Sequence, residues 1–201
     1  MIQNPKSSPP VLVGKHVRLR PIERVDASKY ASSTPIDTFR FFVTQIPKEQ
    51  SEESFKQYVD FILDSPTTQG FTCELIESGR VVGGTTLMDI RTSDDHVEIG
   101  MTWYAPDFRG TFVNPECKYL LLMYAFEELG CQKVTLKCDN RNERSKSAIL
   151  RLGAKHEGVL RRHRFTDNGE WRDTSFYGIV VEEWPEVKAG LAKRLADYEE
   201  P

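Results

Sequence analysis

The chain has 201 residues, of which 39% are hydrophobic and 28% charged, as is usual for a globular protein. No apolar run approaches the roughly 18 to 20 residues that cross a bilayer, and the N-terminal residues lack the apolar core of a secretion signal. The formal net charge of −3 argues against general nucleic-acid binding, which needs a concentrated basic face. We therefore expect a cytoplasmic protein without membrane or nucleic-acid partners.

Four cysteines, Cys73, Cys117, Cys131 and Cys138, form no C-x-x-C pair. The last three fall on segments that the patterns below predict to be helix or strand. Buried, reduced thiols are the expected state. A zinc site is a poor alternative, because the four histidines stand at no ligand spacing from these cysteines. We expect no metal.

The first half of the chain begins with a proline-rich segment. Residues 1–12 predict a flexible tail before a single domain over residues 13–201. Residues 16–22 alternate between apolar and charged, which predicts a strand, and a short helix follows over 24–33. Ser51 then caps a better-marked helix that ends before Pro66.

Three strands are predicted next, over residues 71–77, 80–90 and 95–106, with a Ser-Gly hairpin signal between the first two. Such a meander is antiparallel by default. In the third strand one face is expected to carry Val97, Ile99, Met101 and Trp103, and the other Glu98, Gly100, Thr102 and Tyr104.

The stretch RGTFVNPECKYLL, residues 109–121, begins the helix with the strongest pattern. Asn114 is the expected cap, Pro115 the first helical residue and Gly130 the end. The free N–H groups and the dipole at a helix start attract an anion, and Arg109 adds a positive charge. Many helices begin this way without binding a ligand, so a purely structural loop is the alternative.

The remaining chain predicts a strand over residues 133–138, a helix from Asn142, strands over 154–164 and 171–181, and a C-terminal helix from Pro185. No repeat or low-complexity linker interrupts this order. The economical interpretation is one mixed α/β domain.

Four stretches together resemble a known family: VRLRPIERVD, VEIGMTWYAPDFRGTFVNPECKYLLLMYAFEELG, CDNRNERSKSAILRLGA and HEGVLRRHR with WRDTSFYGIVVEEWP. They resemble the GNAT superfamily of acetyl-CoA-dependent N-acetyltransferases, in particular the branch of ribosomal-protein N-terminal acetyltransferases. The likeness runs from about Val17 to Pro185. It implies the GNAT fold, an α/β (α+β) fold with a mixed, mostly antiparallel sheet of about seven strands flanked by helices.

The resemblance implies a pyrophosphate-binding loop of the form R-x-x-G-x-G/A. Arg109 and Gly110 match its start, whereas Phe112 replaces the central glycine and Asn114 the last small residue. Binding would then use the backbone N–H groups of Thr111, Phe112, Val113 and Asn114, with the Phe112 ring turned aside. A positive φ at Phe112 would be strained.

The resemblance also assigns roles on the third meander strand and on the helix from Asn142. The backbone amides of Met101, Thr102 and Trp103 would pair with the pantetheine arm and polarise the thioester carbonyl. Trp103 is also expected as a core aromatic, and both descriptions can hold.

Three side chains complete the implied site. Glu98 is the candidate general base, directly or through water; the alternative is a solvated or salt-bridged carboxylate. Ser145 is the candidate partner of the departing thiolate, and Asn142 would hydrogen-bond the pantetheine while capping its helix. The alternative for this pair is capping alone. His163 is interpreted as a surface residue of unknown face.

The implied activity is transfer of acetyl from acetyl-CoA to a primary amine, by direct attack in a ternary complex. The acceptor is a protein N-terminus or a small molecule, bound partly by the Phe-rich residues 34–47. The alternative is a non-catalytic acyl-CoA-binding or protein-interaction module of the same fold. A nucleotide-binding protein is a weaker alternative, because no phosphate-loop motif is present. The oligomeric state stays open, with a homodimer among the options.

Overall fold

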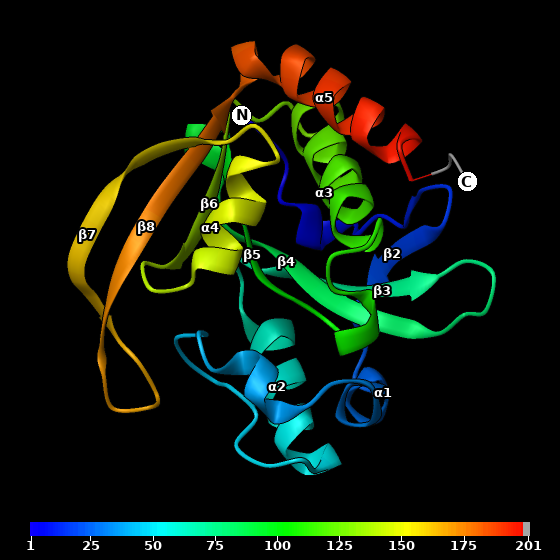
Figure 1. Cartoon of the computed structure of the whole chain (residues 1–201), viewed down its shortest axis with the longest axis vertical. Helices are drawn as coiled ribbons and strands as arrows, with labels where there is room; N and C mark the ends of the chain where they lie inside the picture. Colours follow the sequence, from blue (N-terminus) through cyan, green and yellow to red (C-terminus); the bar gives the residue numbers. More distant parts are fainter. Residues whose placement is uncertain (199–201) are drawn as a thin grey trace.

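An eight-stranded sheet in the order β1-β2-β3-β4-β5-β6-β8-β7 runs through the computed structural model, which describes residues 1–198 (Figure 1). The strands are β1 Leu12–Val13, β2 Val17–Pro21, β3 Gln69–Leu75, β4 Val81–Arg91, β5 His96–Tyr104, β6 Lys133–Asp139, β7 Lys155–Phe165 and β8 Trp171–Val180. The α-helices are α1 Asp26–Ser33, α2 Glu52–Asp64, α3 Val113–Met123, α4 Glu143–Leu150 and α5 Trp184–Ala196. Among the strands of this described part, β5 and β6 alone pair in parallel. The predicted fold class is confirmed, and the eighth strand is the two-residue β1.

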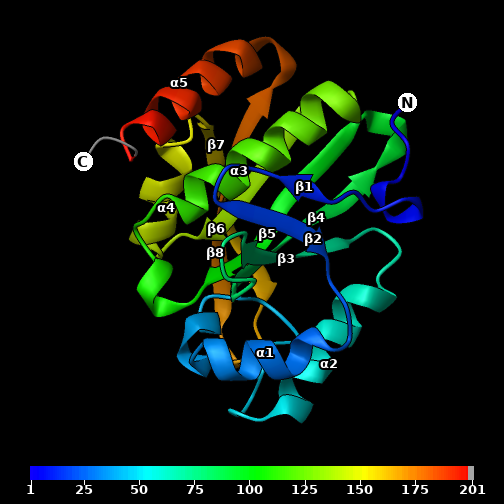
Figure 2. The same cartoon turned by 90° about the vertical axis from the view of Figure 1, so that its right-hand side faces the viewer.

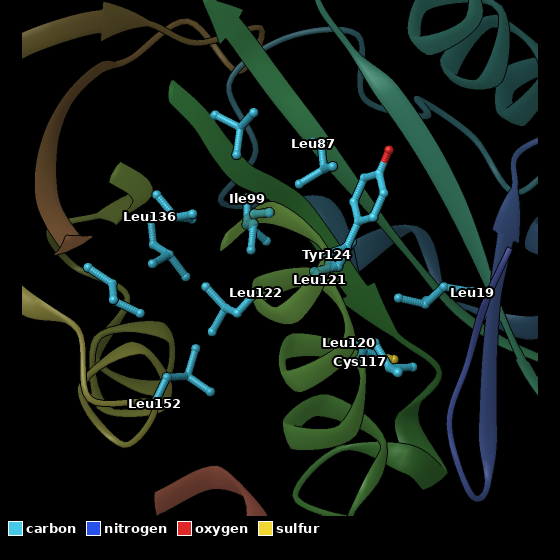
Figure 3. Close-up of a cluster of buried hydrophobic side chains, with 14 of the residues drawn as sticks. Leu19, Leu87, Ile99, Cys117, Leu120, Leu121, Leu122, Tyr124, Leu136 and Leu152 are labelled. Carbon is cyan, nitrogen blue, oxygen red and sulfur yellow. The ribbon is translucent and has the colours of Figure 1, made fainter. Parts of the chain in front are cut away.

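Helices cover both faces of the sheet. Figures 1 and 2 show α3 and α5 on one side and α1 and α2 on the other. Each side has its own hydrophobic cluster: α3 packs with strand residues such as Leu87 and Ile99, while Tyr30 of α1 and Phe55 of α2 pack around Trp103. Figure 3 shows Leu122 of α3 lying between these strand residues and Leu152. Within the described chain, no helix has the length and hydrophobicity needed to cross a membrane.

Helix α3 is apolar on more than one side because it lies between the sheet and α5. Residues 120–122 are all buried, and Phe126 stacks on Trp184 with ring centroids 5.4 Å apart. After Met123 the helix widens into a π-helical turn over Tyr124–Glu128. Figure 3 shows the side chains of residues 120–122 leaving the helix in different directions. A single apolar stripe therefore underestimates how much of this helix is buried.

The start of α3 differs from the prediction. Phe112 already has helical angles, φ −60° and ψ −22°, so the helix begins at Val113, and Asn114 as its cap is wrong. The cause is Thr111, whose hydroxyl accepts the N–H of Val113 at 3.3 Å and donates to the carbonyl of Phe108 at 2.9 Å. The loop thereby supplies a capping hydroxyl three residues before Asn114, and the helix begins two residues earlier than predicted.

Residues 1–12 pack on the domain in place of the expected loose tail. Ile2 is only 6% exposed, and its N–H donates to Asp95 Oδ1 at 2.7 Å. The Lys6 ammonium donates to the carbonyls of Leu63 and Ser65 at the end of α2. An apolar anchor and a lysine at an otherwise open helix end hold this segment.

Strand β5 contains a one-residue bulge beside β4. Thr86 pairs with Gly100 and Gly84 with Trp103, so β5 has one residue more than β4 over this interval. Met101 lies within the bulge and has φ +46°, in the left-handed region. A bulge of one residue exchanges the two faces of the strand beyond it.

The predicted alternation along β5 is therefore wrong after the bulge. Val97 and Ile99 share one face, as predicted; this face packs against α3, and Tyr104 joins them there. Met101 and Trp103 instead pack on the opposite side, with α1 and α2. Sequence alternation alone does not reveal a bulge that contains no glycine at its positive-φ residue.

Strands β5 and β6 separate beyond their first four pairs. Their pairing runs from His96 with Lys133 to Ile99 with Leu136 and then ends. Strand β5 continues toward the loop that precedes α3 paired with β4 alone, while β6 stays paired to β8 as far as Asp139. The separation opens the sheet in its middle.

A buried ion pair fixes α1 to the end of β2. Asp26 is fully buried and accepts from the Arg20 guanidinium at 2.8 Å, from the N–H of Glu23 at 2.9 Å and from the Thr72 hydroxyl at 2.8 Å. Because α1 covers the same side of the sheet as Trp103, this ion pair helps to position α1 beside the opening between β5 and β6.

We expect Asp26→Ala to lower the free energy of unfolding by about 3 kcal/mol, because it removes a buried partner of the Arg20 charge. Chemical denaturation measures the loss. Arg24→Gln is the matched control: its pair with Asp60 is on the surface, so the denaturation midpoint stays unchanged. Equal midpoints for wild type and Asp26→Ala would contradict this role.

Candidate active site

A cavity of about 500 Å³ occupies the space where β5 and β6 separate. It runs from the start of α3 and helix α4 to the segment between α1 and α2 and the hairpin of β7 and β8. The cavity brings together most of the residues assigned from the sequence: Glu98, Met101, Thr102, Trp103, Arg109, Gly110, Thr111, Asn114, Asn142 and Ser145. The side chains of Phe112 and Val113 are directed away from it, into the core.

The loop before α3 turns at Gly110, which has φ +79° and open space where a Cβ would lie. Phe112 has a negative φ, so the strain considered above is absent. Its ring packs on His16, with centroids 5.0 Å apart. The aromatic side chain thus points away from the cavity, and it does not cover the backbone of the loop on the cavity side.

Arg109 fastens this loop to two other segments. Its Nε donates to the Tyr104 carbonyl at 3.1 Å and its Nη2 to the Thr38 hydroxyl at 2.6 Å. Burial lowers the pKa of Arg109, and repulsion from Arg144 adds to this. The guanidinium therefore has a structural function in addition to the charge that it brings to the cavity.

Further arginines that the sequence analysis did not single out also line the cavity. Three of them are Arg144 of α4, Arg151 directly after α4 and Arg194 of α5. One terminal nitrogen of Arg194 is buried without a hydrogen-bond partner. Together with Arg109 they surround the α3 end of the cavity with positive charge, which suits a ligand with several phosphates.

Met101, Thr102 and Trp103 line the cavity at the bulge. They lie beyond Ile99, where the pairing of β5 with β6 ends, so β6 does not pair with this stretch. Trp103 is also a core aromatic, with its ring edge-on to Tyr30 at 4.7 Å. Both sequence interpretations of Trp103 are compatible with this arrangement.

Glu98 is buried beside the cavity, 7% exposed, with Oε2 at 2.6 Å from Lys137 Nζ. Burial raises the pKa of Glu98, and the Lys137 charge opposes the shift without cancelling it. The salt-bridged alternative is thus realised. The ion pair is compatible with a role as general base, because a raised pKa makes the Glu98 carboxylate a stronger base and brings its pKa closer to that of the amine.

Asn142 and Ser145 lie at the start of α4. Asn142 Oδ1 accepts the N–H of Ser145 at 3.1 Å, which confirms the predicted cap. Cys138 also lines the cavity, close to the Ser145 hydroxyl, and burial raises the pKa of its thiol. The sequence alone did not place Cys138 here.

All four cysteines are buried free thiols, as expected. Cys73 and Cys117 are neighbours, with sulfur atoms 3.3 Å apart. Over residues 1–198, no group of three or more His, Cys, Asp or Glu side chains is arranged to hold a metal ion.

His163 lines the opposite end of the cavity, on β7. Its Nδ1 lies 3.1 Å from the Thr174 hydroxyl, and its ring stands edge-on to Phe176. Burial lowers the pKa of His163, and the positive charge of Lys137 adds to this. The histidine is therefore part of the cavity wall instead of an isolated surface residue.

Comparison with known proteins identifies the family. Residues 16–155 match the family model described as "Acetyltransferase (GNAT) domain". The chain belongs to the GNAT acetyltransferases. Members of this family transfer acetyl from acetyl-CoA, and the cavity lies where the fold separates two strands of its sheet.

Three relatives illustrate the likeness. The chain is 25% identical to the "Putative ribosomal N-acetyltransferase YdaF" of Bacillus subtilis (strain 168), covering 86% of this chain and 95% of the relative. A crystal structure described as a "putative acetyltransferase" from T. thermophilus is 35% identical, with TM-score 0.87 and coverage of 93% and 97%. Mycobacterium smegmatis RimJ, solved with CoA-disulfide, shares the fold at 20% identity, TM-score 0.79 and coverage of 93% and 95%.

One buried cation of this GNAT domain was missed in the sequence. Lys118 of α3 is 4% exposed and lines the cavity, with Nζ 2.6 Å from the Thr102 hydroxyl and 3.2 Å from that of Thr85. Burial lowers its pKa from 10.5 to about 8. The signal was a lone lysine between Cys117 and the buried residues 120–122.

The lowered pKa of Lys118 predicts a pH effect on stability. The unfolded chain binds the proton more tightly between about pH 8 and 10.5, so wild type gains stability as pH rises through this window. We expect the free energy of unfolding of wild type to rise relative to Lys118→Met by at most about 1.4 kcal/mol per pH unit. Denaturation at several pH values, with the exposed Lys56→Met as control, measures the difference. A flat difference across the window would contradict the buried ammonium.

Proposed function

We propose that this GNAT domain transfers acetyl from acetyl-CoA to a primary amine by direct attack in a ternary complex. The observation that carries the proposal is one continuous cavity, about 500 Å³, with an anion-binding helix start at one end and the buried carboxylate Glu98 at its wall. The bulged amides of β5 lie between them. If the loop before α3 had a purely structural role, these groups would not need to line the same cavity.

The α3 end of the cavity fits the phosphates of the cofactor. Gly110 lets the backbone come close, the Phe112 ring is turned away, and Arg144 and Arg194 add positive charge. The N–H groups of the first helical turn and the helix dipole favour a pyrophosphate here. The fold shared with the RimJ that was solved with CoA-disulfide supports the same assignment.

Acetyl-CoA supplies a thioester whose carbonyl gains negative charge during attack. The backbone N–H groups of Met101, Thr102 and Trp103 would donate to that oxygen. Donors fixed in this way commonly stabilise the transition state by about 3 to 4 kcal/mol. The bulge at Met101 supports this role, because amides engaged in a regular ladder would be unavailable.

Glu98 would accept the proton of the attacking amine, directly or through water, and Ser145 would donate to the departing thiolate. A primary amine of ordinary pKa is mostly protonated at neutral pH, so a nearby base is needed. Cys138 is the cavity cysteine nearest Ser145, and its raised pKa keeps it a thiol. A covalent acyl-cysteine step is accordingly not proposed.

A protein N-terminus or a small molecule remains the proposed acceptor. The Phe-rich segment between α1 and α2 lines the cavity through Phe41, Phe42 and Val43, and Phe61 of α2 joins it. The name of the YdaF relative includes a ribosomal substrate and supports the protein N-terminus.

We expect Glu98→Gln to lower kcat/KM at neutral pH by about 100- to 10,000-fold, because it removes the base while keeping the shape of the side chain. Ser145→Ala should lower kcat with little effect on acetyl-CoA binding. Release of CoA thiol from acetyl-CoA with a panel of amines, peptides and polyamines measures both. In wild type the acidic limb of the pH profile lies above the ordinary range of a glutamate, in keeping with the raised pKa of Glu98.

Glu77→Gln, in the exposed turn between β3 and β4, is the matched control and should keep full activity. Full activity of Glu98→Gln would reject it as the base. Tight acetyl-CoA binding without thiol release on any amine would instead favour the non-catalytic acyl-CoA-binding module.

A further inference from the structure

Arg172 of β8 is a buried cation at the end of the cavity that Phe41, Phe42 and Val43 line, where the acceptor is proposed to bind. This end is called the acceptor end. The residue is 7% exposed and lines the cavity opposite the cofactor loop. Its Nη1 donates to the Phe41 carbonyl at 3.2 Å, whereas its Nε is buried without a hydrogen-bond partner. A buried guanidinium with an unused donor is costly for a folded chain unless a ligand completes it.

A second arginine faces the same space. Arg164 of β7 stands directly opposite Arg172 in the register of the hairpin, and both line the cavity. Residues opposite each other in an antiparallel pair project from the same face, and like charges there are destabilising. Over residues 1–198, neither Arg164 nor Arg172 takes part in an ion pair.

The carboxylates near Arg172 are already engaged elsewhere. Glu98 pairs with Lys137 at 2.6 Å, and Asp139 pairs with Arg141 at 3.0 Å. Burial lowers the pKa of Arg172, and the fields of Asp139 and Glu98 oppose this without forming a contact. The acceptor end therefore has an excess of positive charge that the protein itself leaves uncompensated.

The cofactor phosphates do not account for this charge. Arg109, together with Arg144 of α4, Arg151 directly after it and Arg194 of α5, would match them at the other end. Arg172 is instead tied to Phe41, in the segment that closes the acceptor side. Beside it lie the apolar side chains of Phe41, Phe42 and Met88.

We propose that the acceptor carries a carboxylate close to its amine, and that Arg172 binds this carboxylate with Arg164 as the outer partner. The inference rests on the acetyltransferase function proposed above. A guanidinium with donors on one side matches the two oxygens of a carboxylate. The substrate class is an amino acid with an apolar side chain, or a peptide whose first residue supplies an acidic side chain.

Binding of acetylated products tests carboxylate recognition without requiring turnover. In the presence of CoA, calorimetry compares N-acetylphenylalanine with N-acetylphenylalaninamide, which differ only in the carboxylate. We expect wild type to prefer the carboxylate by roughly 10- to 100-fold, as for a buried charge-assisted hydrogen bond. The preference should fall to about onefold in Arg172→Met and in part in Arg172→Lys, which keeps the charge without the planar fork.

Matched controls separate this site from general electrostatics and from misfolding. Arg164→Gln should reduce the preference less than Arg172→Met, because Arg164 is more exposed. Arg161→Gln removes an exposed arginine of the same strand that does not line the cavity, and should leave the preference unchanged. CoA affinity should be equal in all variants, since the cofactor end is untouched.

Turnover then distinguishes the two sources of the carboxylate. Phenylalanine against phenylalaninamide tests the free amino acid, and peptides that begin with Glu or Gln test the acidic N-terminus. Because an amino-acid amide has the less basic amine, intrinsic reactivity would favour the amide, so a preference for the carboxylate must come from the site.

Equal binding of both acetylated products, or a preference that survives in Arg172→Met, would overturn the inference. Thiol release at equal rates with both members of each substrate pair would also overturn the inference, but would leave the acetyltransferase function intact. Carboxylate-selective binding without any thiol release would instead reject the acetyltransferase function alone.

Discussion

The site depends on one extra residue in β5. Without the bulge at Met101, Glu98 and Trp103 would project from opposite faces of the strand, because they are five residues apart. With it, the strand contributes Val97 and Ile99 to the α3 side and Trp103 to the α1 and α2 side. The bulge follows directly on the point where β5 leaves β6, after Ile99. A regular strand would have placed Glu98 and Trp103 on opposite faces of the sheet.

Around this opening the protein accumulates buried cations, although the chain as a whole has a net charge of −3. Among residues 1–198, the hydrogen-bond partners of Lys118 are threonine hydroxyls, and that of Arg172 is a carbonyl. Each charge costs free energy of folding that the two hydrophobic clusters must offset. Anionic ligands at both ends would compensate these charges, so the electrostatics favour the bound over the free state.

Local patterns predicted well those features that local chemistry determines. Ser51 and Asn142 cap their helices as predicted, because a side-chain acceptor three residues before a free N–H is sufficient. The bulge could not be predicted, since Met101 adopts a positive φ under the constraint of two strands that diverge. Arg172 and Arg144 also escaped prediction, because only tertiary folding brings β8 and α4 to the same cavity. Lys118, by contrast, was visible as a charge in an apolar run.

The loop before α3 shows how a family pattern can change without losing its geometry. The turn needs one residue of positive φ, and Gly110 supplies it at +79°. Phe112 lies two residues later with helical angles, so a glycine is not required there for backbone reasons. Because the residue has a side chain, it can pack on His16 and fix the loop to the strand that begins at Val17. The aromatic ring therefore holds the helix start on the side away from the cavity, and it does not occupy the space in which the phosphates are proposed to bind.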